Sequence, residues 1–196
     1  MSTTWGDAYF DHMTRFLGDP VDRKVFAQSH ETPPIQILAF DRVFQGCATF
    51  CSLGLTHYDD RIAAIAEILS AVDVHAPRPL PAYFDLLPYV LANSLFYIIQ
   101  NRMSFGRGVS IDGIDKINSQ FVIETGKTAV YFTTPFGLPE EFRLVSHGNR
   151  TGRFHLAMFI SKAEHEFFLD RGADEFENRL ALSDLDAYDL ERSSCV

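Results

Sequence analysis

The sequence predicts an α+β fold in which helices pack on a mixed or mainly antiparallel sheet. Three observations indicate this fold. Short extended segments between residues 24 and 53 recur about every 8 to 12 residues with turn residues between them, which is typical of antiparallel strands. A broad apolar stripe over residues 83–100 indicates a long helix buried against the sheet. A Ser-x-x-Glu motif at residues 161–164 indicates the start of another helix.

Length and composition predict a single domain spanning residues 1–196. The chain has 196 residues, of which 46% are hydrophobic and 13% aromatic, enough to bury a sizeable core. Its three cysteines lack the spacing of a disulfide framework and indicate a reducing compartment. The N-terminus lacks the features of a secretory signal, and the most apolar window, residues 86–99, is too short to span a bilayer. We therefore expect a cytoplasmic protein without a membrane partner.

The charge balance indicates what kind of partner the chain can bind. A formal net charge of −9 argues against binding to nucleic-acid phosphates. It permits a basic protein partner that is drawn in by long-range attraction. Much of the acidic excess lies within residues 163–191, which we interpret as a solvated helix face followed by an acidic tail.

The first elements follow from apolar spacing and turn residues. Thr4 is suited to cap a helix that ends near residues 18–20. Extended runs then predict strands over residues 24–28, 35–40 and 47–53. The helix is predicted because apolar side chains recur at helical spacing, at Trp5, Tyr9, Met13, Phe16 and Leu17.

Cys47 and Cys51 lie four residues apart in the third predicted strand. On a helix they could share a metal ion. On a strand their Cα atoms stand about 13 Å apart, which is too far for one zinc ion or a disulfide. Because Thr49, Phe50 and the flanking glycines favour the strand, we interpret both cysteines as small buried apolar residues.

The middle of the chain combines an undecided segment, a long helix and a loop. Residues 61–72 fit a helix by the spacing of their isoleucines, whereas the neighbouring segments favour a strand. A proline-rich connector at residues 75–81 precedes the helix over residues 83–100, and Pro88 lies near its first turns, where its cost is smallest. Residues 105–115 predict a loop punctuated by glycine.

The last third of the chain contains further strands and a helix. The helix that starts at Ser161 is expected to end or bend at Gly172, and further helical turns follow up to residue 182. Extended runs predict three strands that precede this helix in the sequence, over residues 120–124, 128–134 and 153–160.

Motifs that carry catalytic chemistry are incomplete in this sequence. Residues 124–128 resemble the end of a phosphate-binding loop, but Phe121 stands where that motif requires glycine. We predict a hairpin turn there instead. His165 and Glu166 lack the second histidine of a zinc motif, since Leu169 occupies its position, and we expect both side chains to be exposed.

The histidines leave one catalytic alternative open. Seven histidines are scattered among predicted turns and element ends, and the sequence does not show whether any three converge. The first groups to inspect are His30 with Glu31 and His57 with the acids at 59–60. Cys195 lies beside the end of the chain, where we expect a mobile thiol rather than a nucleophile. We therefore predict no catalytic residue, metal or cofactor, and keep a histidine-based metal-dependent hydrolase as an alternative.

Several segments keep an order that is known from a protein family. They are PPIQILAF, TFCSLGLTHYD, AEIL, FGRGVSIDG, FTTPFGLPEEF, HLAMFISKAEHEFFLDRGADEF and DLERSSCV, spread from about residue 33 to the C-terminus. In this order they resemble the Suppressor of Fused family, specifically its N-terminal-type domain. The AEIL segment lies where the family has a strand, which favours a strand over residues 61–72. Arg107, Gly108 and Val109 replace a Gly-His-Thr sequence that is usual in the family's glycine loop.

The resemblance implies an α/β sandwich-like domain that binds proteins and has no catalytic activity. Bacterial single-domain members are associated with polymorphic toxin systems, where they resemble immunity proteins, so we expect a toxin domain as partner. Animal members bind a transcription factor, which leaves a regulatory scaffold that captures a peptide by strand addition as an alternative. The oligomeric state stays open. The loop at 105–113 and the acidic C-terminal helices supply the candidate partner-binding residues: Phe105, Arg107, Asp112, Asp174, Glu175 and Glu177.

Overall fold

The computed structural model describes residues 4–44, 47–59, 62–69 and 83–196 of the chain. Its helices are α1 (Trp5–Leu17), α2 (Tyr83–Gln100), α3 (Ile114–Ile117), α4 (Ser119–Thr125) and α5 (Lys162–Leu182). Its strands are β1 (Asp22–Phe26), β2 (Ile35–Phe44), β3 (Cys47–Leu53), β4 (Ile62–Leu69), β5 (Val109–Asp112), β6 (Ala129–Thr133), β7 (Leu144–His147) and β8 (Arg150–Ile160). Short 3₁₀ helices occupy Leu55–His57 and Glu140–Arg143.

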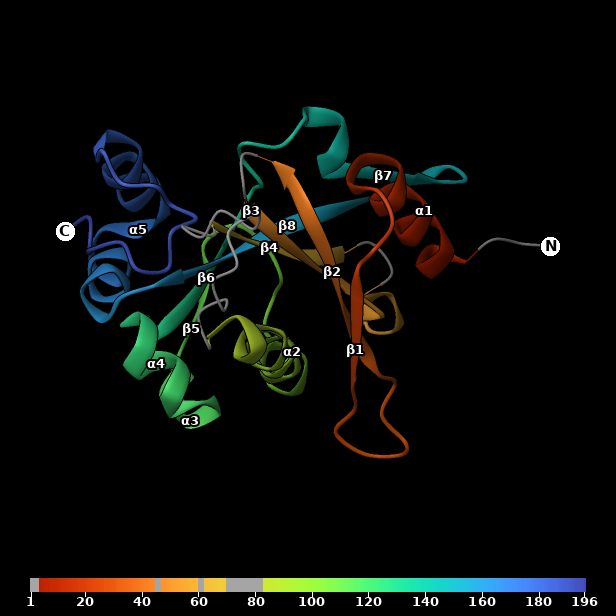
Figure 1. Cartoon of the computed structure of the whole chain (residues 1–196), viewed down its shortest axis with the longest axis horizontal. Coiled ribbons are helices and arrows are strands. Elements are labelled where there is room, and N and C mark those ends of the chain that lie inside the picture. Colours follow the sequence, from red (N-terminus) through yellow and green to blue (C-terminus); the bar gives the residue numbers. More distant parts are fainter. Residues whose placement is uncertain (1–3, 45–46, 60–61, 70–82) are drawn as a thin grey trace, which may run out of the picture.

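One mixed sheet of eight strands lies at the centre of the described part of the chain (Figure 1). The strands follow one another in the order β1-β2-β3-β4-β8-β6-β5, and β7 pairs with β8 beside this path. Strands β4 and β8 run parallel, whereas the other pairs are antiparallel. The predicted α+β class with a mainly antiparallel sheet is therefore confirmed.

Helices cover both faces of this sheet, which creates two apolar cores (Figure 1). One core lies under α2, α3 and α4, and the other lies under α1 and α5. Strand β8 contributes to both, because successive side chains of a strand point to opposite faces. Phe154 and Leu156 belong to the core of α1 and α5, whereas Ala157 and Phe159 belong to the core of α2. Both faces of β8 are thus covered, which explains its almost continuous apolar sequence.

The predictions for the ends of α1 and α5 are confirmed. The Thr4 hydroxyl accepts a hydrogen bond from the Asp7 backbone N–H at 3.2 Å, and the Asp7 carboxylate accepts one from the Thr4 N–H at 2.8 Å. Ser161 and Glu164 form the same capping box at the start of α5. Gly172 interrupts α5 with φ 83° and ψ 175°, a conformation almost confined to glycine. Helix α5 therefore bends at the residue where the sequence predicted a bend or an end.

Strands β1, β2 and β3 lie where the sequence predicted strands, and α2 has the predicted bounds. Cys47 and Cys51 both belong to β3, and Cys51 is fully buried. The undecided segment at 61–72 forms strand β4 over its described residues, while residues 70–72 and the connector at 75–81 lie outside them. In the described chain, every helix falls short of the length and apolar character needed to cross a membrane.

The strand predicted over residues 120–124 is wrong, because these residues belong to helix α4. The Asn118 side chain caps this helix by accepting a hydrogen bond from the Phe121 N–H at 2.9 Å. Gly126 ends it in the left-handed conformation, with φ 68°. Residues 124–128 are therefore a helix-to-strand turn and not the predicted hairpin turn.

The loop predicted over residues 105–115 is only partly correct. Val109–Asp112 form strand β5, which pairs with β6 in antiparallel register from Val109 opposite Phe132 to Asp112 opposite Ala129. The glycines on either side of this segment suggested a loop, but pairing with a strand far along the sequence decides its conformation.

The mobile thiol predicted at Cys195 is also wrong, since the C-terminal segment is docked. Glu164 forms a buried ion pair with Arg192, and its Oε1 accepts a hydrogen bond from the Cys195 N–H at 3.1 Å. The Lys127 ammonium donates to the Arg192 carbonyl oxygen at 2.7 Å. Burial, followed by the charge of Glu164, raises the pKa of the Cys195 thiol to about 11. The thiol is therefore enclosed and protonated at neutral pH.

His165 is buried rather than exposed, whereas Glu166 is exposed as predicted. The first turn of α5 rests on the sheet, and His165 Nε2 lies 3.1 Å from the Ser110 hydroxyl oxygen on β5. A helix residue that faces a sheet in this way has no sequence signal beyond its position relative to the other buried side chains.

Candidate protein-binding surface

Arg107 holds the glycine loop between α2 and β5 against α5. Its guanidinium forms ion pairs with the carboxylates of Asp174 and Glu177. The distances to Glu177 Oε2 are 2.9 Å from Nε and 2.7 Å from Nη2. Gly108 has φ 81°, a conformation that favours glycine, and it lies next to Ala173 of α5. We call Arg107, Asp174 and Glu177 the Arg107 cluster.

Glu177 joins this cluster to the centre of the sheet. Its Oε1 accepts hydrogen bonds from the hydroxyls of Tyr131 at 2.7 Å and Thr133 at 2.6 Å, both on β6. Burial alone raises the pKa of Glu177, but hydrogen bonds from Arg107, Thr133 and Tyr131 outweigh it and lower the pKa. Glu177 is therefore ionised at neutral pH. Burial and the hydrogen bond to Glu177 in turn raise the pKa of Tyr131.

The structure brings four of the six predicted partner-binding residues together, namely Phe105 and the Arg107 cluster. Phe105 is partly buried, and its ring centroid lies 5.0 Å from that of Phe132 and 5.6 Å from that of His155. This packing fixes the start of the loop on the α2 side of the sheet. The loop is thus anchored on both faces, by an aromatic contact and by an ion-pair cluster.

The acidic candidates Asp174 and Glu175 lie exposed on α5, whereas Asp112 lies on β5, away from the Arg107 cluster. The Asp174 side chain is 86% exposed despite its ion pair, and Glu175, the next residue of α5, is also exposed. Asp112 lies at the far end of β5, where its carboxylate accepts a hydrogen bond from the Gly113 N–H at 2.7 Å. Asp112 therefore does not join the Arg107 cluster.

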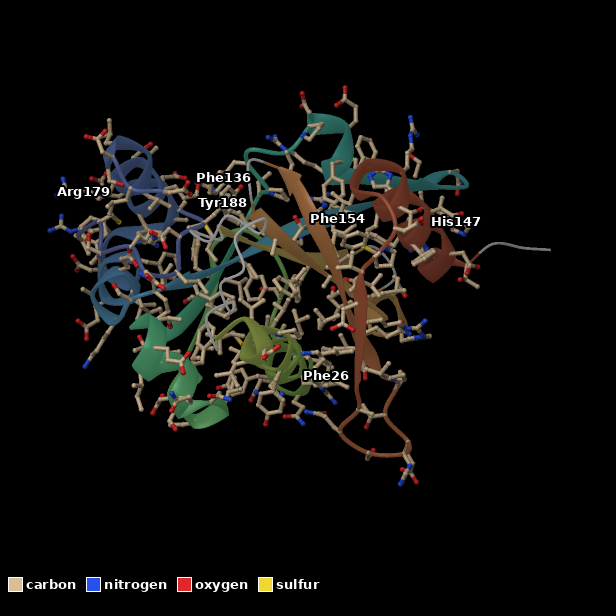
Figure 2. All side chains as sticks on the ribbon, in the orientation of Figure 1. Phe26, Phe136, His147, Phe154, Arg179 and Tyr188 are labelled. Carbon is tan, nitrogen blue, oxygen red and sulfur yellow. The ribbon has the colours of Figure 1, made fainter. Side chains whose placement is uncertain are left out.

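A groove of about 690 Å³ lies beside the Arg107 cluster, between α5 and the segments that follow β6 and α5. Its lining includes Arg107, Glu177, Ala181, Phe136 and Tyr188. The rings of Phe136 and Tyr188 stack with centroids 5.2 Å apart, and the Tyr188 hydroxyl donates to the Phe136 carbonyl oxygen (Figure 2). Aromatic side chains that are already held in place lose little entropy when a partner binds. We call this hollow the Tyr188 groove.

A second hollow, a cleft of about 560 Å³, shares Arg107 and Arg143 with the Tyr188 groove. Arg153 and His155 of β8 also line it. His155 is only 6% exposed, and its Nδ1 has no hydrogen-bond partner among the described residues. Arg143 Nε is likewise buried and has no hydrogen-bond partner among the described residues. Burial, and then the charge of Arg153, lowers the pKa of His155 to about 4, so the imidazole is neutral at pH 7. We call this hollow the Arg143 cleft.

Sequence reasoning did not single out Arg143, Arg153 or His155 as site residues. One signal was available, since Arg153 and His155 occupy alternate positions of an otherwise apolar strand and so share a face. Their approach to Arg143 depends on the pairing of β7 with β8, in which Leu144 lies opposite Arg153. Strand β7 was not predicted, so this convergence could not be inferred.

Of the histidine groups selected for inspection, His30, Glu31 and His57 lie outside the lining of these hollows, whereas Asp59 lines the Arg143 cleft. His30, Glu31 and His57 are exposed, and Asp60 lies outside the described residues. Over residues 4–44, 47–59, 62–69 and 83–196, no three side chains of His, Cys, Asp or Glu are placed to hold a metal ion.

Comparison with known proteins gives the chain a family. The model of the family described as Suppressor of fused protein (SUFU) matches residues 31–193. Immunity protein YqcF of Bacillus subtilis (strain 168) is 25% identical over 191 residues, which cover 92% of this chain and 91% of that protein.

Solved structures of similar proteins share the fold. A putative SUFU homologue from Neisseria gonorrhoeae FA 1090 gives a TM-score of 0.71 at 16% identity, covering 98% of this chain and 97% of that one. A chain of the Sufu-Fu complex gives 0.70 at 12% identity, covering 100% of this chain and 93% of that one. Drosophila Suppressor of Fused gives 0.61 at 12% identity, covering 94% of this chain and 50% of that one. Because the family model matches most of its sequence, the chain belongs to the Suppressor of Fused family.

Proposed function

We propose that this chain is a non-catalytic binding protein that neutralises a toxin by covering part of its surface. The observation that carries the proposal is the similarity to Immunity protein YqcF over nearly the full length of both chains. An inhibitor of this kind needs a complementary shape and charge rather than activated side chains. The rigid ion-pair cluster beside an aromatic groove supports such a role.

We place the toxin contact on the Tyr188 groove and the adjoining Arg107 cluster. Phe136 and Tyr188 supply aromatic area that is already ordered, which is the usual character of energetically important contact residues. Asp174 and Glu175 supply exposed negative charge at the edge of the groove. Phe105, which lines the neighbouring cleft, and Asp112, at the far end of β5, extend the candidate surface.

The direct test is to co-express the chain with the toxin candidate encoded next to its gene. Restored growth together with a purified one-to-one complex is the expected result. A candidate that remains toxic and forms no complex with the chain contradicts the proposal for that pair, and the same result with every neighbouring candidate contradicts it in general.

A pair of matched variants tests the contact surface. Ala181 is exposed and lines the Tyr188 groove, whereas Ala163 is exposed at the other end of α5. Ala181→Arg should fill the groove and weaken toxin binding by about tenfold or more, while Ala163→Arg should leave the affinity unchanged. Calorimetric titration measures both affinities, and circular dichroism shows that both variants are folded. Equal weakening by the two variants would exclude the groove as the contact.

The position of β5 favours a second candidate function, the capture of an extended peptide. This strand is the last in the sheet order and pairs only with β6 among the described strands. Its other side can therefore accept a further strand. A bound peptide should slow amide hydrogen exchange within Val109–Asp112, whereas a folded toxin on the Tyr188 groove should protect residues of α5. Protection of neither segment would exclude both contacts.

A further inference from the structure

Strand β8 changes from apolar to polar along the face that α2 covers. Phe159 and Ala157 belong to the apolar core on this face, and the alternation of side chains places His155 and Arg153 on the same face. Arg153 lies opposite Leu144 of β7 and Ile62 of β4, and His155 lies opposite Ala64. The Arg143 cleft therefore begins where the apolar core of this face ends, at the part of β8 that pairs with β4 and β7.

Two polar atoms in this cleft are buried without a hydrogen-bond partner among the described residues, His155 Nδ1 and Arg143 Nε. The His155 side chain is more than nine-tenths buried and lines the cleft. Buried polar atoms in folded proteins are nearly always hydrogen-bonded, so two orphan atoms in one hollow indicate a missing group. The neutral imidazole can place its proton on Nδ1, and Arg143 Nε always carries one. Both atoms can thus act as donors.

The cleft carries charges of both signs, and its positive groups without an ion pair are guanidinium groups. Arg107 is paired with two carboxylates of α5, but neither Arg143 nor Arg153 forms an ion pair with a described residue. Asp59 and Glu140 are the acidic residues among the described lining. The two guanidinium groups without an ion pair lie on a chain with a net charge of −9. That net charge also disfavours polyanions, which leaves a small anionic group as the fitting ligand.

We propose that the Arg143 cleft is a subsite for one carboxylate group, supplied by an aspartate or glutamate side chain of the protein partner. A carboxylate is planar and has two oxygens, so one can accept from Arg143 and the other from His155. The carboxylate chemistry follows from the cleft itself. The assignment of its source to a partner side chain rests on the proposed function.

The first arm of the test uses the full-length chain with acetate as the probe. Nuclear magnetic resonance follows the Arg143 Nε–H and the His155 imidazole during an acetate titration at constant ionic strength and pH 7. We expect saturable shifts at both groups. Arg143→Gln and His155→Gln should each weaken acetate binding by about tenfold or more, while Arg171→Gln, at an exposed arginine of α5 outside the cleft, should not. Unsaturable shifts, shifts that persist in Arg143→Gln, or equal binding of chloride or inorganic phosphate would overturn the carboxylate subsite.

The second arm uses the toxin and separates the two proposals. Arg143→Gln should weaken toxin binding, and Arg171→Gln should leave it unchanged. If acetate binds but Arg143→Gln holds the toxin as tightly as the original chain, the carboxylate comes from a free small molecule and its assignment to the partner is overturned. If the chain neutralises a toxin but does not bind acetate, the carboxylate subsite is overturned and the proposed function stands. If the chain binds acetate but neutralises no toxin, the carboxylate subsite stands and the proposed function is overturned.

Discussion

At the scale of single residues, a buried ion pair fastens the C-terminal segment to the first turn of α5. The side chains of Arg192 and Glu164 are 1% and 0% exposed. Removing two charges from water is costly, and the pair offsets this cost only while both partners are present. Burial raises the pKa of Glu164, but the hydrogen bonds and charge of Arg192 outweigh it and keep the pKa low.

Arg192→Met should therefore destabilise the chain strongly, because it leaves the Glu164 carboxylate buried and unpaired. We expect the free energy of unfolding to fall by about 3 to 5 kcal/mol, measured by urea denaturation. Lys162→Met removes the exposed pair between Lys162 and Glu166, whose atoms lie 3.7 Å apart, and should change stability little. Similar losses in both variants would show that the buried pair contributes no more than an exposed one.

His155 should make stability depend on pH. Its pKa is about 4 in the folded chain, below the ordinary value of 6.5. Between these values the unfolded chain binds a proton that the folded chain does not, so the free energy of unfolding falls as the pH is lowered from 6.5 towards 4. The full effect is on the order of 3 kcal/mol. Carboxylates such as Glu164 add their own loss only near and below their ordinary value of 4.5.

The measurement is urea denaturation at several pH values between 6.5 and 5. His155→Gln should show a flatter dependence than the original chain, whereas His57→Gln, at an exposed position, should keep the original dependence. Parallel curves for the original chain and His155→Gln would mean that this imidazole does not control stability.

At the scale of elements, the bend in α5 decides where the candidate surface lies. Before Gly172 the helix packs on the sheet through Phe168, whose ring contacts that of Tyr131, and after it the helix carries Glu177 to Arg107. The backbone of Gly172 has φ 83° and ψ 175°. A residue with a Cβ resists this conformation, so the two halves of α5 depend on glycine for their relative direction.

Gly172→Ala should reduce the free energy of unfolding by about 1 to 3 kcal/mol and also weaken toxin binding, because the helix would have to straighten or shift. Denaturation and calorimetric titration measure the two effects. Gly6→Ala is the control, since a Cβ at Gly6 would meet only the Thr4 hydroxyl oxygen, at 3.5 Å, its φ is not positive, and α1 does not line either hollow. A neutral result for Gly172→Ala would show that α5 tolerates another geometry at the bend.

At the scale of the whole molecule, the net charge of −9 affects how fast a basic partner arrives. Asp174→Asn with Glu175→Gln should slow association by about two- to fivefold at low salt, and by less at high salt. Glu177 stays unchanged in this variant because it accepts hydrogen bonds from Tyr131 and Thr133. Stopped-flow or surface plasmon resonance measurements give the rates.

The control for this experiment removes two exposed charges from the same helix at a distance from the groove, Glu166→Gln with Asp170→Asn. If both double variants slow association equally, the attraction comes from the net charge and not from the candidate surface.

Local sequence patterns predicted much of the fold. Thr4 and Ser161 indicated the starts of two helices, Gly172 indicated the bend, and the apolar stripe of α2 indicated its bounds. These features depend on contacts within one or two helical turns, which the sequence displays directly. Residues 120–124 were predicted wrongly because the Asn118 cap and the Gly126 ending outweigh the local preference for a strand.

The candidate surface could be predicted only in part. The sequence by itself determined an acidic α+β chain with a glycine loop and an acidic late helix as candidate contacts. Only the tertiary structure decided that Arg107 pairs with Glu177, and that Arg143 and His155 meet in one cleft. The physical reason is that side-chain ion pairs and shared hollows depend on which strands pair and which faces the helices cover. Those are long-range contacts, and neither spacing nor composition along the chain records them.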